Sequence, residues 1–171
     1  MQKLFLALSM VIIMAGSAAA HGNISKLPFS VQILQYKMKL YMNADDLDTI
    51  NNLAMAYFYS GKMADAKEQL EIILAADEHN FNALDGMGMV ALKQSDNDRA
   101  LEFFERAQKI NAKDMYLLVH LSVAHNNSGQ TELAEKEMKM AKSLASDELD
   151  KTWIENEVKI LSHSAKAGAK E

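Results

Sequence analysis

The sequence predicts an all-α protein built from repeated antiparallel helix hairpins. Three observations support this prediction. The segment from Asn80 to Ala112 matches the chain again when it is shifted by 34 residues in either direction, and a repeat of this length is typical of stacked helical units. Within each copy, apolar residues recur at helical spacing. Turn-forming and helix-capping residues keep the same register in all three copies.

Each copy carries a first helix with two large apolar residues and one small residue, and a second helix in which an Ala precedes further apolar residues. Position by position, these residues are Ile50, Leu84 and Leu118; Leu53, Met87 and Leu121; Ala54, Gly88 and Ser122; Ala66, Ala100 and Ala134; Leu70, Phe104 and Met138; and Ile73, Ala107 and Ala141. Small residues allow the two helices to approach closely. We therefore expect these positions to form the packing surface of each hairpin.

Short polar residues mark where the helices begin and where the chain turns. The expected turn positions are Gly61, Ser95 and Gly129, and the expected N-caps are Asp46, Asn80 and Asp114. An Asp or Asn side chain at an N-cap accepts a hydrogen bond from a backbone N–H that has no partner inside the helix.

This pattern resembles the tetratricopeptide repeat (TPR) family, whose unit is a helix hairpin with large and small residues at the same period. The resemblance covers three repeats, at 47–80, 81–114 and 115–148. It implies a TPR-like right-handed superhelix of antiparallel helix hairpins with N- and C-terminal capping helices. The chain departs from the family pattern at three positions. The favoured Tyr is kept only as Tyr57, and the other copies have Ala91 and His125. The favoured Trp is replaced by Ile50, Leu84 and Leu118, and the favoured Pro between repeats is replaced by Glu78, Ala112 and Ser146.

Residues 1–20 have the pattern of a secretory signal peptide. Lys3 precedes an apolar run at 4–15 that is shorter than the roughly 20 residues a membrane-spanning helix needs. The run ends in small residues, and Ala18 and Ala20 suit cleavage after Ala20. We therefore expect an exported protein, periplasmic or secreted. An uncleaved membrane anchor is the alternative.

Residues 21–46 are expected to form an N-terminal segment with a capping helix, which the pattern places between Leu27 and Met42. Its predicted apolar seam consists of Val31, Leu34, Met38 and Tyr41. We expect this helix to cover the open apolar edge of the first hairpin, because helical-repeat proteins need capped ends. The alternative is a docking helix for a partner or a second copy.

Residues 149–163 are expected to form a C-terminal capping helix, because the repeat pattern ends there while one apolar side continues. That side consists of Leu149, Trp153, Val158 and Leu161. Residues 164–171 are small and charged, and we expect them to form a disordered tail.

In the TPR family the first helices line a concave groove, and the resemblance implies which residues face it. These are Asn51, Asn52, Met55, Phe58, Tyr59, Asn82, Asp85, Met89, Lys93, Tyr116, Val119, His120, Val123, Asn126 and Asn127. Amide and apolar side chains together suit a peptide or a partner's helix. A terminal carboxylate suits the groove less, because Lys93 is its only cation. We expect Asn52, Met89, Tyr116 and His120 to be exposed. Alternatively, the groove side chains complete the superhelix or pack against the N-terminal helix.

Composition narrows the function classes. The formal net charge is −5 at pH 7, and no repeat carries the basic stripe that nucleic-acid binding needs. The chain has no Cys, and it lacks a nucleophile motif, a phosphate-binding loop and paired histidines at metal-ligand spacing. We therefore expect no enzyme activity and no cofactor. A remote alternative is copper binding, in which His21 chelates the ion as the mature N-terminus.

These observations favour an exported TPR adaptor or scaffold that binds a protein or peptide partner in its groove. A role in assembling an envelope or secretion complex is the expected setting. The alternative is a structural subunit of such a complex that associates with itself as a homo-oligomer.

Overall fold

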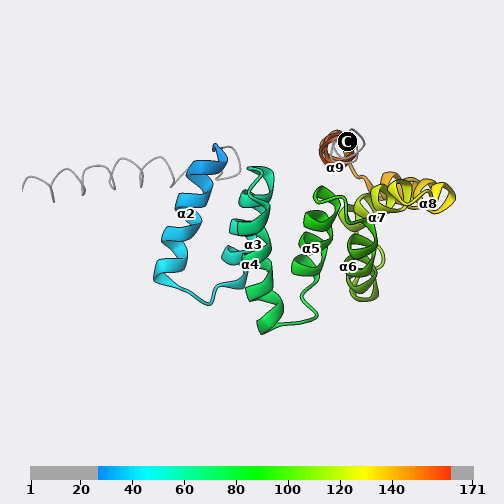
Figure 1. Ribbon diagram of the computed structural model, residues 1–171. Helices are drawn as coiled ribbons and strands as arrows, with labels where there is room; N and C mark the ends of the chain where they lie inside the picture. The colour runs from blue at the N-terminus through cyan, green and yellow to red at the C-terminus, as the bar shows by residue number, and fades with distance from the viewer. Residues whose placement is uncertain (1–26, 163–171) are drawn as a thin grey trace, which may run out of the picture.

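The computed structural model of the protein describes residues 27–162. Over this range the chain folds into eight α-helices and no strand, which confirms the all-α prediction (Figure 1). The helices are α2 (Phe29–Met42), α3 (Leu47–Tyr59), α4 (Met63–Ala76), α5 (Phe81–Lys93), α6 (Asn97–Ile110), α7 (Met115–Asn127), α8 (Thr131–Leu144) and α9 (Glu148–Ser162). The predicted signal peptide and the predicted tail lie outside the described residues.

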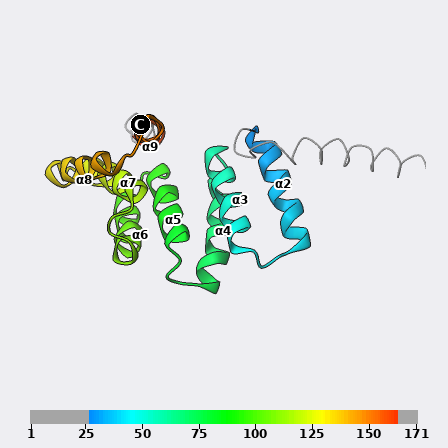
Figure 2. The same ribbon diagram turned by 180° about the vertical axis from the view of Figure 1, so that it is seen from behind.

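Three antiparallel hairpins, α3–α4, α5–α6 and α7–α8, stack side by side. The second helix of one hairpin packs against the first helix of the next, so α4 contacts α5 and α6 contacts α7. The first helices also contact one another, α3 with α5 and α5 with α7. Seen from behind, the stack has α2 at one end and α8 at the other (Figure 2). Among the described helices, none has the length and apolar character needed to cross a membrane.

The predicted N-caps are confirmed. The Asn80 side chain accepts a hydrogen bond from the Ala83 backbone N–H at 3.1 Å. Asp46 and Asp114 accept in the same way from the amide three residues further along the chain. These bonds satisfy donors that the first turn of each helix leaves open, so the start of α3, α5 and α7 is determined locally by the sequence.

The predicted turns are confirmed as well. Gly61 and Gly129 have φ angles of 82° and 76°. Ser95, at the same position of the second repeat, has a φ angle of 62°. This left-handed conformation costs a residue with a Cβ roughly 1–2 kcal/mol, whereas Gly adopts it freely. The second repeat therefore carries a small backbone strain that the other two avoid.

Small residues set the distance between the helices. A Cβ built on Gly88 would lie 2.3 Å from the Phe104 ring of the same hairpin. A Cβ on Gly86 would lie 2.9 Å from Leu70 of the preceding hairpin. Phe104 and Leu70 are fully buried, so these two glycines let large side chains fill the space within a repeat and between repeats.

The terminal helix α2 packs against α3, but not through the predicted seam. Its buried side carries Gln32 and Ile33, with Tyr36 and Leu40 partly buried against the core. The predicted seam of Val31, Leu34, Met38 and Tyr41 is exposed instead. The prediction was wrong because α2 has two apolar stripes, and α3 takes the one that contains Ile33.

The terminal helix α9 breaks the stacking rule of the preceding hairpins. It packs mainly against α7 and also contacts α5, whereas a helix continuing the stack would pack chiefly against α8. In Figure 1 it lies across the ends of α5 and α7, with its axis turned toward the viewer. Its buried residues are Ile154, Glu157 and Leu161. Leu149, which was expected on the apolar side, is 78% exposed.

Candidate binding face on the first helices

Helices α3, α5 and α7 form a surface that we call the first-helix face. In the structure, α9 crosses part of this face, so some of the side chains that the sequence predicted to meet a partner meet α9 instead. The contacts come from all three first helices, through Tyr59 of α3, Lys93 of α5 and His120 of α7. The face therefore holds a helix of its own chain.

Four ionisable side chains, the polar cluster, connect α9 to the first helices. The cluster consists of Tyr59, Asp85, His120 and Glu157. His120 Nδ1 lies 2.7 Å from Asp85 Oδ1, and the Tyr59 hydroxyl donates to Glu157 Oε2 at 3.2 Å. His120 Nε2 lies 3.9 Å from Glu157 Oε1, too far for a hydrogen bond, and these two buried atoms have no hydrogen-bond partner. The cluster is thus only partly satisfied.

Burial and charge shift the pKa values of this cluster. Burial lowers the pKa of His120, but the charge of Asp85, its hydrogen bond and the charge of Glu157 raise that pKa more, so it lies above its ordinary value. Burial raises the pKa of the Glu157 carboxyl group, although His120 and Tyr59 oppose the shift. Burial likewise raises the pKa of Tyr59. Its phenol therefore stays protonated and able to donate to Glu157.

Aromatic and main-chain contacts complete the docking of α9. The ring of Trp153 meets the Tyr116 ring edge-on, with centroids 4.5 Å apart. The same indole lies 5.9 Å from the His120 ring. Further along α9, the ammonium group of Lys93 donates to the Ile160 carbonyl oxygen at 2.9 Å. Such a donor at the last turn satisfies a carbonyl that the helix leaves open.

The predicted groove residues are exposed to very different degrees. Those that are buried are Phe58, Met89, Val119, His120 and Val123; those that are half-buried are Asn51, Met55, Tyr59, Asp85, Lys93 and Asn127; those that are exposed are Asn52, Asn82, Tyr116 and Asn126. The expectation of exposure was wrong for Met89 and His120, which are each 2% exposed. His120 is covered because α9 brings Trp153 and Glu157 against it.

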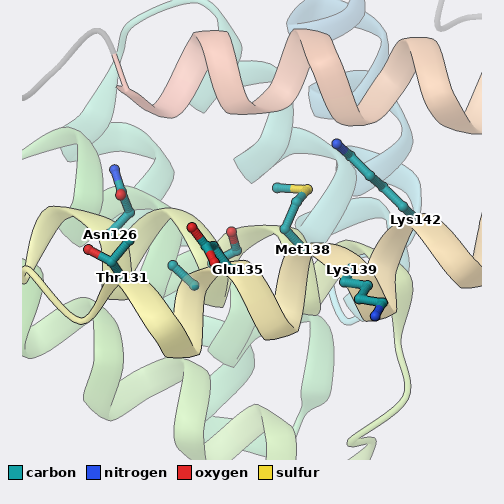
Figure 3. A pocket seen from close by; sticks show the side chains of 8 residues that line it. Asn126, Thr131, Glu135, Met138, Lys139 and Lys142 are labelled. Atoms are coloured by element: carbon teal, nitrogen blue, oxygen red, sulfur yellow. The ribbon is translucent and has the colours of Figure 1, made fainter.

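Two predicted groove residues at the end of α7 contact second helices. Asn126 lines a cavity of about 430 Å³ together with Met138 and Lys142 of α8. Figure 3 shows Met138 and Lys142 pointing from α8 toward the side on which α9 lies. The Asn127 amide lies 3.5 Å from Asn97 of α6. These two residues therefore do not join the side chains around the polar cluster.

A second hollow, of about 640 Å³, borders α9 on the first-helix face. It is lined by Lys93 of α5 and by Asn156, Lys159 and Ile160 of α9. The exposed Ile160 side chain gives this hollow an apolar wall, and Lys93 and Asn156 supply hydrogen-bonding groups. Over the described residues, no group of three His, Cys, Asp or Glu side chains is placed to hold a metal ion.

Sequence reasoning missed Glu157, which is the residue of α9 that reaches both α3 and α7. A signal for it was present, because Trp153, Glu157 and Leu161 follow one another at four-residue spacing. An acid inside an apolar helical stripe indicates a buried carboxyl group that needs partners. Its partners could not be read from the sequence, since Tyr59 lies 98 residues away.

Comparisons with known proteins agree with this fold. The model of the family described as tetratricopeptide repeat matches residues 82–114, the second repeat. No curated protein matches the chain by sequence.

Among solved structures, a MamA protein aligns with a TM-score of 0.56 and 21% identity, over 68% of this chain and 63% of its own. The type III secretion translocator chaperone SycD of Yersinia enterocolitica aligns with a TM-score of 0.58 and 18% identity, over 76% of this chain and 98% of its own. A thermophilic TPR protein of Thermus thermophilus aligns with a TM-score of 0.64 and 16% identity, over 84% of each chain. The chain thus spans less than two thirds of that MamA protein. Together these matches support the TPR family and show an all-α TPR-like helical-repeat fold.

Proposed function

We propose that this protein is a non-enzymatic interaction scaffold that binds a helix or peptide of a partner protein on its first-helix face. The observation that carries the proposal is the docking of α9. Three consecutive first helices already hold a helix through an aromatic contact, a main-chain hydrogen bond and a buried acid. A surface that binds one helix in this way has the chemistry to bind another.

The partner would lie beside α9, on the part of the face formed by α3 and the start of α5. Exposed Asn52 and Asn82 and half-buried Met55 are available there. The half-buried Asn51 lies next to Asn52, and its amide oxygen is buried without a hydrogen-bond partner.

The setting we propose is outside the cytoplasm, in the assembly of an envelope or secretion complex. The support is the signal-peptide pattern of residues 1–20 and the likeness of the fold to a secretion chaperone. Intact-mass measurement on exported material tests the export step. It should give a mature chain that begins at His21, and recovery of a membrane-bound chain retaining residues 1–20 would contradict it.

Affinity purification of the tagged mature chain from its own cells tests partner binding. The variants Asn52→Arg and Asn82→Arg place a bulky cation on the open part of the face. We expect them to keep the helical circular dichroism of the wild type and to lose a partner that the wild type enriches.

A matched control places the same new charge away from this face. Ala75→Arg changes an exposed residue of α4, and it should enrich the partner as well as the wild type does. If all three variants enrich the same proteins equally, the first-helix face is not the binding surface. If Ala75→Arg alone loses the partner, the binding surface lies on the second helices.

A further inference from the structure

The outer side of α2 exposes more large apolar side chains than any other described helix. Leu34 is 59% exposed, Met38 is 53% exposed and Tyr41 is 90% exposed. Val31 continues the row toward the start of the helix, at 38%. Figure 2 shows α2 at the end of the stack, and no described helix lies beyond it. We call this row the α2 seam.

The spacing of the α2 seam is that of a helix–helix interface. Val31, Leu34, Met38 and Tyr41 follow at steps of three, four and three residues. Alternation of four and three places all the side chains along one narrow line, which is the pattern of two helices packed side by side. Phe29 and Met42 of the same helix are exposed as well, at 39% and 84%.

Among the described helices, α2 packs mainly against α3, and it does so through the side that carries Ile33, Tyr36 and Leu40. The seam lies on the other side, where no described helix covers it. A second copy of the chain would bring an identical apolar row against the seam.

The seam is complementary to itself. In an antiparallel pair of α2 helices with Leu34 opposite Met38 of the second copy, Val31 falls opposite Tyr41 of the second copy. A two-fold axis repeats each of these two contacts, and each contact pairs side chains of different size. Such a pairing buries the same patch on both chains, as a two-fold dimer interface does.

The charged side chains of α2 do not repel one another in this pairing. The helix has no Asp or Glu, and its two lysines are turned toward aromatic rings of their own chain. The Lys37 ammonium lies 5.7 Å from the Tyr57 ring centroid, and that of Lys39 lies 5.8 Å from the Tyr36 ring centroid. Neither lysine belongs to the seam, so two seams meet without facing like charges.

We propose that two copies of this chain form a two-fold dimer through their α2 seams. One helix of this length offers less surface than the roughly 800 Å² per partner of a standard interface. The dimer therefore dissociates at low protein concentration, in the micromolar range. This inference uses a surface distinct from the first-helix face, so it stands or fails independently of the proposed partner binding.

Sedimentation velocity on the mature chain over a range of concentrations tests the dimer. The wild type should shift from monomer to dimer as concentration rises. Leu34→Asp places a carboxylate in the centre of the seam, on a side chain exposed enough for the fold to tolerate it. This variant should remain monomeric at all concentrations while its circular dichroism stays unchanged.

The control is Leu133→Asp on α8, where the replaced leucine is 44% exposed. It makes the same substitution at the opposite end of the stack and should leave the monomer–dimer shift in place. A wild type that stays monomeric at millimolar concentration would overturn the proposal. A dimer that survives Leu34→Asp would also overturn it, and so would one that Leu133→Asp disperses, since α2 would then meet α8 head to tail.

Discussion

The second and third repeats present different surfaces to the helix that follows them. The second repeat packs against α7, which continues the stack. The third repeat is followed by α9, which does not continue the stack. At matching positions, the second repeat has Gly88, Leu92, Leu101 and Phe104, whereas the third has Ser122, Asn126, Glu135 and Met138. The apolar surface is covered by a helix, and the polar one borders an open cavity of about 430 Å³ (Figure 3).

This difference explains why α9 leaves the stack. A helix packed over the third repeat would have to bury polar groups such as Asn126 and Glu135, at about 1–3 kcal/mol for each group left without a partner. On the first-helix face, Glu157 and Trp153 find partners in Tyr59, His120 and Tyr116. Where the repeat pattern ends in the sequence, the next helix, α9, therefore packs on the first-helix face instead of on the third repeat.

The interior of the third repeat is also more polar than the interior of the second repeat. The second repeat packs Ala91 and Phe103 at positions where the third has His125 and Glu137. His125 Nδ1 lies 2.7 Å from Glu137 Oε2, and burial raises the pKa of Glu137. A polar pair of this kind gains less than apolar packing of similar volume. We therefore expect the third repeat to open before the second.

The largest expected effect separates the small residues of the two repeats. Gly88→Ala should destabilise the protein by about 3 kcal/mol, because the new methyl group overlaps Phe104. Ser122→Ala, at the matching position, should change stability by less than about 0.5 kcal/mol. Urea unfolding of both variants measures the difference. Equal losses would show that the third repeat is packed as tightly as the second.

A second pair of variants tests the helix that follows each small residue. Ala100 is fully buried, and Ala134 borders the open cavity. Ala100→Leu should cost about 1–3 kcal/mol by overpacking, whereas Ala134→Leu should cost less than about 1 kcal/mol because the cavity can receive the added atoms. Thermal unfolding compares the two. An unchanged midpoint for Ala100→Leu would mean that Ala100 does not face its partner helix.

Tyr59→Phe tests the attachment of α9 and keeps the aromatic ring at the end of α3. It removes the hydroxyl that donates to Glu157, at about 1 kcal/mol for the lost hydrogen bond. Hydrogen exchange should accelerate in α9 and remain unchanged in α5 and α6. Faster exchange throughout the chain would indicate that α9 and the hairpins unfold as one unit.

The smallest expected effect lies in the strained turn of the second repeat. Ser95→Gly should raise stability by a few tenths of a kcal/mol, up to about 1, because Gly adopts the left-handed conformation without steric cost. Gly129→Ser, at the matching turn of the third repeat, should lower stability by a similar amount. Chemical unfolding measures both. A loss of stability in Ser95→Gly would show that the serine side chain contributes more than the strain costs.

Features that depend on neighbouring residues were predictable from the sequence, and features that depend on competition between surfaces were not. The cap at Asn80 and the turn at Ser95 follow from short stretches of chain. The orientation of α2 did not, because Ile33 and Leu34 lie on two apolar stripes and only contact with α3 selects one of them. Likewise, the sequence predicted a helix around Trp153 but not its position, which depends on polar residues more than twenty positions earlier, such as Asn126.

The central claim is that the polar cluster holds α9 on the first-helix face, and its pH dependence follows from the pKa directions. The pKa values of His120 and Glu157 are raised in the folded chain, so the folded state binds their protons more tightly than the unfolded state does. Their stabilising contribution is present at low pH. It is lost as pH rises above the ordinary values of 4.5 for Glu157 and 6.5 for His120.

Trp153, the only tryptophan of the chain, reports this docking directly. At about pH 5.5 its emission should be that of a shielded indole and resist acrylamide quenching, and both properties should weaken as pH rises toward about 8. In His120→Gln the change between these pH values should largely disappear. An indole that is equally open to quencher at every pH, or a titration that His120→Gln leaves intact, would contradict the account.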